Sequence, residues 1–441
     1  MFEIKDKPKM VERALLISAY IQAGDKPEAE SLLGELEELV NTLGIPVIDR
    51  LLISHREAHA NLLLGSGKAE SIAALAKEKL IDVIVFDNEL TPAQQRNWEK
   101  LTGALVIDRQ EVILDIFGKR ARTREARIQV DLARMEYSLP RLVRAWSHLG
   151  QQGGGIGAKG EGESQLEQDK RNIRGQIDRL KRDLAAVRRQ RATQRKDRKR
   201  APVPNAAIVG YTNAGKSSLL RALTGAEVLI EDKLFATLDT TTRKIALPNN
   251  QPLLLTDTVG FVRKLPHRLI EAFNATLEEA VMADFLIHLL DVSQPEVLTF
   301  YETTRKVLTE LGAEEKRMLL VFNKIDKARD PSTLPWARRN FPNAHFISVK
   351  TGEGLPELVS RIGEFVADEL LTIELRIPQN RSDLIARLHR EADIRSTDYD
   401  GNDVCIRARL SPRAAISYQP FIVNGTNQIV SPYPHSDGLT H

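Results

Sequence analysis

The sequence predicts an α/β protein: a P-loop domain, preceded by a small N-terminal α/β domain and a basic antiparallel helical hairpin, and followed by a small C-terminal α+β domain. Three observations support this prediction. A glycine-rich phosphate loop occupies residues 210–217, an Asn-Lys-x-Asp motif occupies residues 323–326, and a basic stretch with apolar residues every seven positions precedes both. We place the domains at residues 1–118, 119–201, 202–371 and 372–441.

The phosphate loop has the pattern Gly-x-x-x-x-Gly-Lys-Ser, between a candidate strand at residues 205–209 and a candidate helix from residue 218. In that setting the loop N–H groups and the positive helix end surround phosphates, Lys216 neutralises their charge, and the Ser217 hydroxyl binds Mg²⁺. A chance glycine-rich loop is the alternative. The expected nucleotide ligands are Gly210, Tyr211, Thr212, Asn213, Ala214, Gly215, Lys216 and Ser217.

A γ-phosphate sensor is predicted after the candidate strand at residues 253–256. Asp257 there can support Mg²⁺ indirectly, and the N–H of Gly260 can meet the γ-phosphate. The motif comprises Asp257, Thr258, Val259 and Gly260.

A loop between these motifs has little helical or strand periodicity. We expect Thr237 in this loop to bind Mg²⁺, with Thr240, Thr241 and Thr242 as rivals and a simple threonine-rich turn as the alternative. The segment also supplies the remaining expected nucleotide-binding residues of this region: Phe235, Ala236, Thr237, Leu238 and Asp239.

The motif at residues 323–326 predicts which base is bound. It follows an apolar strand candidate at residues 318–322, and ligands bind at the carboxyl ends of strands in open α/β sheets. Asp326 can accept hydrogen bonds from guanine N1–H and N2–H₂, which adenine lacks, so we expect discrimination of roughly 10⁴ to 10⁵. The expected base-binding residues are Asn323, Lys324, Ile325 and Asp326, with Ser348, Val349 and Lys350 after a strand at residues 344–347.

Together the motifs predict a GTPase that binds GTP or GDP with Mg²⁺, in which Lys216, Thr237 and Gly260 act on the phosphates. Many GTPases orient the attacking water with a glutamine directly after the Asp-x-x-Gly motif, but Phe261 stands there. We therefore expect slow intrinsic hydrolysis, on the order of 10⁻⁴ to 10⁻² s⁻¹. Asn213 is a candidate ligand for K⁺, with a loop-stabilising amide as the alternative.

The region before the predicted hairpin carries no catalytic constellation. Apolar runs alternate with helical patterns before residue 118, which favours a mixed or parallel α/β domain, and residues 373–377, 383–392 and 403–410 suggest two strands and a helix. The single cysteine, Cys405, excludes an intramolecular disulfide. A charged start and the lack of a long apolar run predict a cytoplasmic protein without a membrane span.

The predicted hairpin is the most basic part of the chain. Residues 170–200 contain fourteen Lys or Arg and three Asp, an excess of eleven positive charges in a chain whose net charge is +3. A solvated coiled-coil face is the ordinary interpretation, but such faces usually mix both signs, which favours RNA phosphate as the partner. The apolar positions are Leu166, Ile173, Leu180 and Val187 with Ile177 and Leu184, facing Ile128, Leu132, Met135 and Leu139.

Two other glycine-rich segments resemble nucleotide-binding motifs but are not expected to bind nucleotides. The residues Gly155-x-Gly157-x-x-Gly160 match the dinucleotide fingerprint, but they follow a helical region and not a strand. The segment at residues 65–69 resembles a second phosphate loop, but Leu62 and Ala69 stand where a glycine and a hydroxyl are required.

Seven segments are typical of one known family: residues 106–109, 113–117, 120–125, 163–169, 210–217, 235–239 and 257–261. Through them the chain resembles, over nearly its whole length, the HflX family of P-loop GTPases. The resemblance implies a ribosome-associated GTPase that binds the large ribosomal subunit and ribosomal RNA and separates stalled ribosomes under stress. We expect a monomer off the ribosome and no DNA partner.

At the hairpin tip, the family's usual arginine and proline are replaced by Lys159 and Glu161, which weakens the expected RNA contact. Two alternatives remain open: a GTPase acting on a non-ribosomal RNA complex, such as one for transfer-RNA modification, and ATP-dependent RNA remodelling through the N-terminal domain.

Overall fold

The computed structural model describes residues 11–141, 161–199, 203–225, 234–235, 237–248, 251–264, 279–328, 330, 332–367, 371–410 and 412–425. The expected hairpin tip and Ala236 lie outside the described residues. By contacts the chain divides into two compact units: the first contains Met1–Arg188, Ile230–Asp239 and Val259–Leu277, and the second Arg189–Leu229, Thr240–Thr258 and Glu278–His441. Each unit is described by itself.

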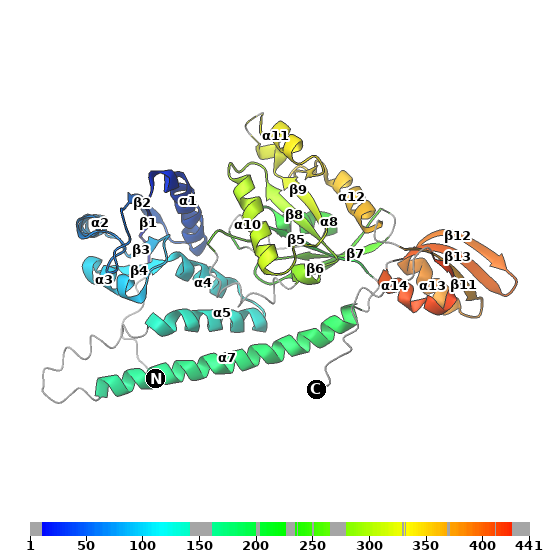
Figure 1. Cartoon of the computed structure of the whole chain (residues 1–441), viewed down its shortest axis with the longest axis horizontal. Helices are drawn as coiled ribbons and strands as arrows, with labels where there is room; N and C mark the ends of the chain where they lie inside the picture. Colours follow the sequence, from blue (N-terminus) through cyan, green and yellow to red (C-terminus); the bar gives the residue numbers. More distant parts are fainter. Residues whose placement is uncertain are drawn as a thin grey trace. The chain divides into compact units, whose positions relative to one another are not determined.

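The first unit contains a four-stranded parallel sheet in the order β2-β1-β3-β4, which confirms the expected α/β domain (Figure 1). Trp98, Phe86 and Leu15 are fully buried in its core, and the Trp98 indole donates to the Leu62 carbonyl at 2.8 Å. The elements are β1 (Ala14–Tyr20), α1 (Lys26–Leu43), β2 (Val47–Ser54), α2 (Ser66–Glu78), β3 (Val83–Phe86), α3 (Pro92–Thr102), β4 (Leu105–Asp108) and α4 (Arg109–Arg120).

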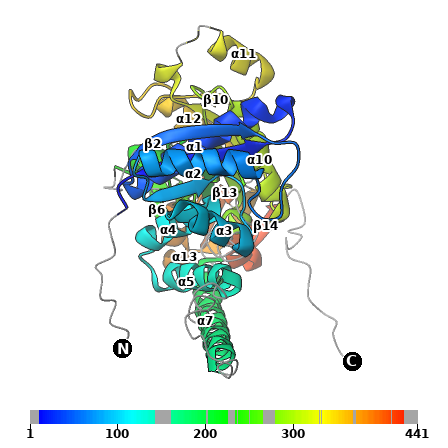
Figure 2. The ribbon, with the colours of Figure 1, turned by 90° about the vertical axis from the view of Figure 1, so that its left-hand side faces the viewer.

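The two helices of the predicted basic hairpin pack together in the same unit, which includes the chain up to Arg188. Helix α5 (Arg124–Ser138) lies beside the long helix α7 (Glu161–Lys199) in both views (Figures 1 and 2). The seam is apolar, as the seven-residue pattern predicts, and Lys181 adds an ion pair to Glu136 at 2.8 Å. The seam residues are Ile128, Leu132, Met135, Leu139, Ile173, Ile177, Leu180, Leu184 and Val187.

An acidic cluster is buried where α4 and α5 meet the C-terminal end of the sheet. The Tyr137 hydroxyl donates to Asp108 Oδ1 at 3.0 Å and to Glu111 Oε2 at 3.3 Å, and the Arg141 guanidinium stacks 3.5 Å from the centre of the Tyr137 ring. Burial, together with the charges of Asp108 and Asp115, raises the pKa of Glu111 to about 7. Ionised Glu111 therefore destabilises this cluster.

Replacing Glu111 with glutamine is expected to flatten the pH dependence of stability. The folded state binds the Glu111 proton more tightly than the unfolded state, so the contribution of Glu111 to stability falls as pH rises from about 4.5 to about 7. At pH 8 the glutamine variant should exceed the wild type by about 1–3 kcal/mol in urea unfolding, and near pH 4.5 the two should agree. The exposed Glu70→Gln variant is the control, and parallel pH profiles for all three proteins would contradict this reading.

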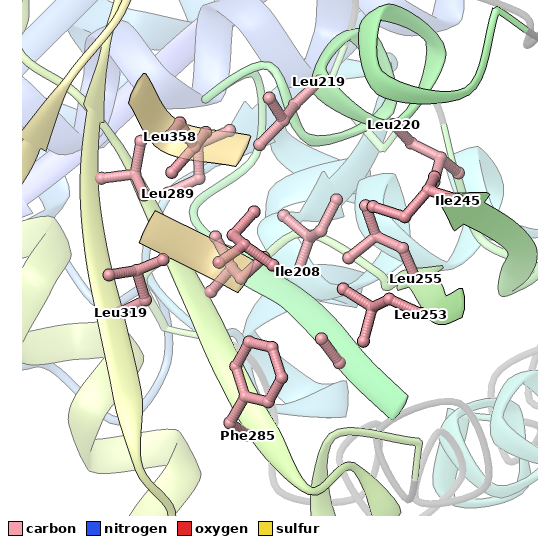
Figure 3. Packing of buried hydrophobic residues seen from close by; sticks show 14 of the residues in the cluster. Ile208, Leu219, Leu220, Ile245, Leu253, Leu255, Phe285, Leu289, Leu319 and Leu358 are labelled. Carbon is pink, nitrogen blue, oxygen red and sulfur yellow. The ribbon is translucent and has the colours of Figure 1, made fainter. Parts of the chain in front are cut away.

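The second unit contains a six-stranded sheet in the order β10-β9-β8-β5-β7-β6, parallel except for β6. Its apolar core gathers strand residues such as Ile208 and Leu255 with Leu219, Leu220 and Leu358 from helices (Figure 3). The strands are β5 (Asn205–Gly210), β6 (Thr241–Ala246), β7 (Pro252–Asp257), β8 (Phe285–Asp291), β9 (Met318–Asn323) and β10 (His345–Phe346), and the helices are α8 (Lys216–Thr224), α10 (Val297–Glu310), α11 (Thr333–Asn340) and α12 (Leu355–Ala367).

The structure differs from the sequence expectation in two strands. Residues 241–246, expected to lack regular structure in part, form β6, in which Thr242 pairs with Thr256 of β7 and their hydroxyls are 2.9 Å apart. The register with β7 supplies backbone partners that local periodicity does not reveal. The strand expected at residues 344–347 is reduced to the two residues of β10, because only His345 and Phe346 pair with β9.

The C-terminal α+β domain is built on an antiparallel sheet in the order β12-β13-β11-β14. Alternate residues of β11 and β13 are buried, and Tyr418 and Leu388 complete the core. The elements are β11 (Leu371–Pro378), α13 (Ser382–Glu391), β12 (Asp393–Asp400), β13 (Asp403–Leu410), α14 (Pro412–Ser417) and β14 (Ile422–Gly425). Among the described helices of the whole chain, none is long and apolar enough to cross a membrane.

Candidate nucleotide-binding site

The phosphate loop connects β5 to α8, as its motif predicts. Gly210 and Gly215 have φ angles of +147° and +98°, which only glycine adopts without strain. A Cβ atom at Gly210 would collide with the Leu289 carbonyl oxygen, and one at Gly215 with the Asn323 side-chain amide. The close approach of β8 and β9 therefore requires glycine at both positions. The space that bound phosphates need is a second reason for glycine here.

Lys216 is buried inside this loop. Its Nζ donates to the carbonyl oxygens of Gly210 at 3.1 Å and Tyr211 at 2.8 Å. Burial lowers the pKa of Lys216 to about 8, although the charge of Asp257 opposes this shift. A bound triphosphate would supply the negative charge that the buried ammonium group needs, so the loop is built for an anionic ligand.

Oxygen ligands suited to Mg²⁺ meet at the start of α8. The Ser217 hydroxyl donates to Asp257 Oδ2 at 2.6 Å, and Thr258 fixes the end of β7 through a bond from its hydroxyl to the Ile208 carbonyl at 2.7 Å. A hydroxyl and a carboxylate beside a phosphate loop fit Mg²⁺, which usually combines one or two protein oxygens with phosphate oxygens and water. No cluster of three His, Cys, Asp or Glu side chains suitable for a metal occurs among the described residues.

The two predicted base-binding segments lie together at the carboxyl ends of β9 and β10. Asn323 joins them to the phosphate loop, because its Nδ2 donates to the Ala214 carbonyl at 2.9 Å and its Oδ1 accepts from the Val349 N–H at 3.1 Å. The Ser348 hydroxyl donates to Asp326 Oδ1 at 2.7 Å and so orients the carboxylate. Ile325 and Lys350 lie within the same two segments.

Two contacts of this site are absent from the motif-based expectation. Lys324, at φ +65°, pairs with Asp291 Oδ2 at 2.8 Å, and the rings of Tyr211 and Phe300 are stacked at 4.0 Å. Asp291 is the last residue of β8, which pairs with β9. A carboxylate at the end of a buried strand was therefore the sequence feature that could have indicated this contact. The Tyr211 contact with α10 has no comparable signal in the sequence.

Of the expected phosphate sensors, Thr237 and Gly260 belong by their contacts to the first unit, whereas Asp257 belongs to the second. In one segment, Phe235 and Leu238 are buried and Thr237 is partly exposed; in the other, Val259 and Phe261 are buried. Phe261, which we expect not to orient the attacking water, is only 2% exposed. Gly260 lies between these two buried side chains. Thr241 and Thr242 are held in β6, whereas Thr237 and Thr240 lie outside it.

These features define the class of protein. A phosphate loop between a buried strand and a helix, an Asp-x-x-Gly motif after β7 and an Asn-Lys-x-Asp motif after β9 on one mostly parallel sheet make this chain a P-loop GTPase.

Comparisons with known proteins agree and specify the family. Three family models match: GTP-binding GTPase N-terminal at residues 30–118, GTP-binding GTPase Middle Region at residues 120–198, and 50S ribosome-binding GTPase at residues 205–324. The protein named GTPase HflX from Akkermansia muciniphila is 53% identical over 90% of this chain and 94% of its own length, and the one from Escherichia coli K12 is 41% identical over 86% and 88%. The chain belongs to the HflX family of GTPases and is a GTP-hydrolysing enzyme.

A solved structure is also similar. The crystal structure of a GTP-binding protein from Sulfolobus solfataricus in complex with GDP is 23% identical and covers 81% of this chain and 99% of that chain, with a TM-score of 0.43.

Proposed function

We propose that this GTPase binds the large ribosomal subunit through ribosomal RNA and separates or rescues stalled ribosomes under stress. The observation that carries this proposal is the basic hairpin. Its apolar seam is satisfied within the chain, so a partner would meet its exposed basic side chains. On α7 these include Arg171, Arg174 and Arg179.

The chemistry of the hairpin suits a phosphate backbone. Arginine donates to phosphate oxygens in a fixed fork, and a predominantly basic helix attracts RNA at long range. One family model that matches this chain is described as a 50S ribosome-binding GTPase, which supports the ribosome as the source of that RNA. The cytoplasm is the compartment that contains this partner.

Nucleotide binding would gate the RNA-binding form. Lys216 would neutralise the phosphates, the Gly260 N–H would meet the γ-phosphate, and the Ser217 and Thr237 hydroxyls would hold Mg²⁺. Mg²⁺ supplies charge neutralisation of the triphosphate. Asn213 is exposed at φ +59°, and its side chain makes no hydrogen bond within the described residues, which supports K⁺ binding by its oxygen over a loop-stabilising role. With Phe261 buried, ribosomal contact is expected to accelerate hydrolysis.

Replacing Lys216 with alanine is expected to abolish nucleotide-dependent association with ribosomes, because the buried charge that holds the phosphates is lost. Wild type with a non-hydrolysable GTP analogue should sediment with large subunits and enlarge the free-subunit peaks in a sucrose gradient, whereas GDP should not support this. The exposed Lys306→Ala variant in α10 is the matched control. Equal association with GTP and GDP would contradict the gating, and association only with small RNA would favour the non-ribosomal alternative.

A further inference from the structure

Asp291 is a buried carboxylate beside the predicted base-binding segments, and all of these residues belong to the second unit. It is the last residue of β8 and pairs across the sheet with Asn323, the last residue of β9 (Figure 1). Its Oδ1 accepts from the Ser293 N–H at 3.0 Å and from the Ser293 hydroxyl at 2.6 Å. Its Oδ2 pairs with Lys324 Nζ at 2.8 Å, and the side chain of Asp291 is only 7% exposed. Ser293 therefore fixes the direction in which this carboxylate meets Lys324.

The backbone of Lys324 has a conformation that needs support from its surroundings. Its φ of +65° and ψ of +35° lie in the left-handed region, which a residue with a side chain seldom adopts unless its neighbours impose it. The Ile325 N–H donates to the Ile347 carbonyl oxygen at 3.3 Å, which ties down the backbone directly after Lys324. The ion pair with Asp291 ties down the side chain. Both contacts hold the turn that leads from β9 to Asp326.

Lys324 and Asp326 carry opposite charges in this turn, but they have different partners. The Asp326 carboxylate accepts from the Ser348 hydroxyl at 2.7 Å, and this neutral donor leaves the negative charge of Asp326 in place. The Lys324 ammonium group is neutralised by Asp291. An unpaired ammonium group in the same turn would compete with guanine for Asp326, because opposite charges attract strongly where water is partly excluded.

We infer that Asp291 is a positioning residue for guanine recognition. It holds the Lys324 ammonium group, so that the Asp326 carboxylate stays available to the N1–H and N2–H₂ groups of guanine. Asp291 acts on the base through these two residues and lies outside the Asn-Lys-x-Asp motif. The inference rests on the assignment of Asp326 as the guanine ligand and adds the residue that maintains the selectivity of that site.

Equilibrium binding of GTP and of inosine triphosphate to the full chain tests this inference. Inosine lacks the N2–H₂ group, so the ratio of the two affinities reports how well Asp326 recognises guanine. Asp291→Asn keeps the size of the side chain and removes its charge. It should weaken GTP binding about tenfold and lower the ratio of GTP to inosine triphosphate affinity severalfold. The kcat for GTP hydrolysis should not change, because the phosphate ligands are untouched.

Two further variants separate this role from a general loss of structure. Combining Asp291→Asn with Lys324→Met removes the unpaired ammonium group and should return the affinity ratio toward the wild-type value. Asp291→Glu keeps the charge and should retain most of the ratio. Asp284→Asn is the matched control, because Asp284 directly precedes the first residue of β8 and accepts from the Asn205 N–H at 2.9 Å at the other end of the strand. The control should bind both nucleotides as the wild type does.

The inference is overturned if Asp291→Asn leaves the affinity ratio unchanged, whether or not binding of both nucleotides weakens. It is also overturned if the double variant with Lys324→Met keeps the lowered ratio. Unchanged GTP binding in Asp326→Asn would instead contradict the assignment of the base-binding site itself. Ribosomes are not needed for these measurements, so failure of ribosome association is a separate result.

Discussion

Asp326→Asn is expected to weaken GTP binding on the order of 10⁴-fold while improving binding of xanthosine triphosphate. The carboxylate can accept from both the N1–H and the N2–H₂ of guanine, and Ser348 holds it in place at 2.7 Å. The side-chain N–H₂ group of an asparagine would face the N2–H₂ group of guanine, so two hydrogen-bond donors would oppose each other. Xanthine carries an oxygen at that position, so the same amide becomes complementary to it.

Equilibrium binding of labelled nucleotides to the full chain measures this change. The control is Asp330→Asn, which removes the charge of an exposed carboxylate shortly after the motif. The control should bind GTP as the wild type does. A loss of GTP binding in Asp326→Asn without any gain for xanthosine triphosphate would show that the variant is damaged in a way unrelated to base reading.

Glu35→Ala is expected to destabilise the first unit by about 3–5 kcal/mol, since it removes the carboxylate partner of the buried Arg263 and one of the two carboxylates that pair with Arg109. Glu35 Oε1 accepts from Arg109 Nη1 at 3.0 Å, and Oε2 accepts from Arg263 Nε at 2.8 Å. Arg109 is 2% exposed, and Arg263 is 8% exposed. Neither guanidinium can recover its lost partner from water.

The same cluster contains a second carboxylate. Asp87 accepts from Arg109 Nε at 2.7 Å and from Lys264 Nζ at 2.7 Å. Burial alone would raise the pKa of Asp87, but the charges of Arg109 and Lys264 outweigh burial and lower it. The α/β domain alone contributes two carboxylates and one arginine here, and the segment after Gly260 adds two cations, so three cations face two carboxylates.

Thermal unfolding compares Glu35→Ala with Glu37→Ala on the same helix. Glu37 pairs with Arg50 at 2.8 Å on the surface, where such pairs contribute about 0–1 kcal/mol. The melting transition of the Glu35 variant should fall by roughly 10 °C, and that of the Glu37 variant by a few degrees at most. The double variant Glu35→Ala with Arg263→Met should lose less than the sum of the single changes, because the unpaired arginine is removed as well. Equal decreases in melting temperature for Glu35→Ala and Glu37→Ala would falsify the argument that the buried ion pairs of Glu35 stabilise the first unit.

Much of the second unit could be predicted from consecutive residues. The apolar run before Gly210 becomes β5, and the run before Asn323 becomes β9, because a strand buried on both faces requires continuous apolar sequence. The hairpin seam could also be predicted, since Ile177 and Leu184 repeat at the spacing of one helix face. The strand β6 was not predicted, because its threonines are fixed by pairing with β7 and not by local preference.

The sequence by itself determined that the chain carries the motifs of a GTPase and predicted the ligand sets of its nucleotide site, because each set consists of neighbouring residues whose spacing is the motif. Lys216, Ser217 and Asp326 could be assigned roles without coordinates for that reason. Only the tertiary structure decided which parts of the chain contact the two segments that contain the expected phosphate sensors Thr237 and Gly260. Arg263 meets Glu35 across 228 residues, and Asp239 meets Thr123 across 116. Such pairs depend on how distant segments fold back on one another, and a charged residue in a loop carries no local pattern that names its partner.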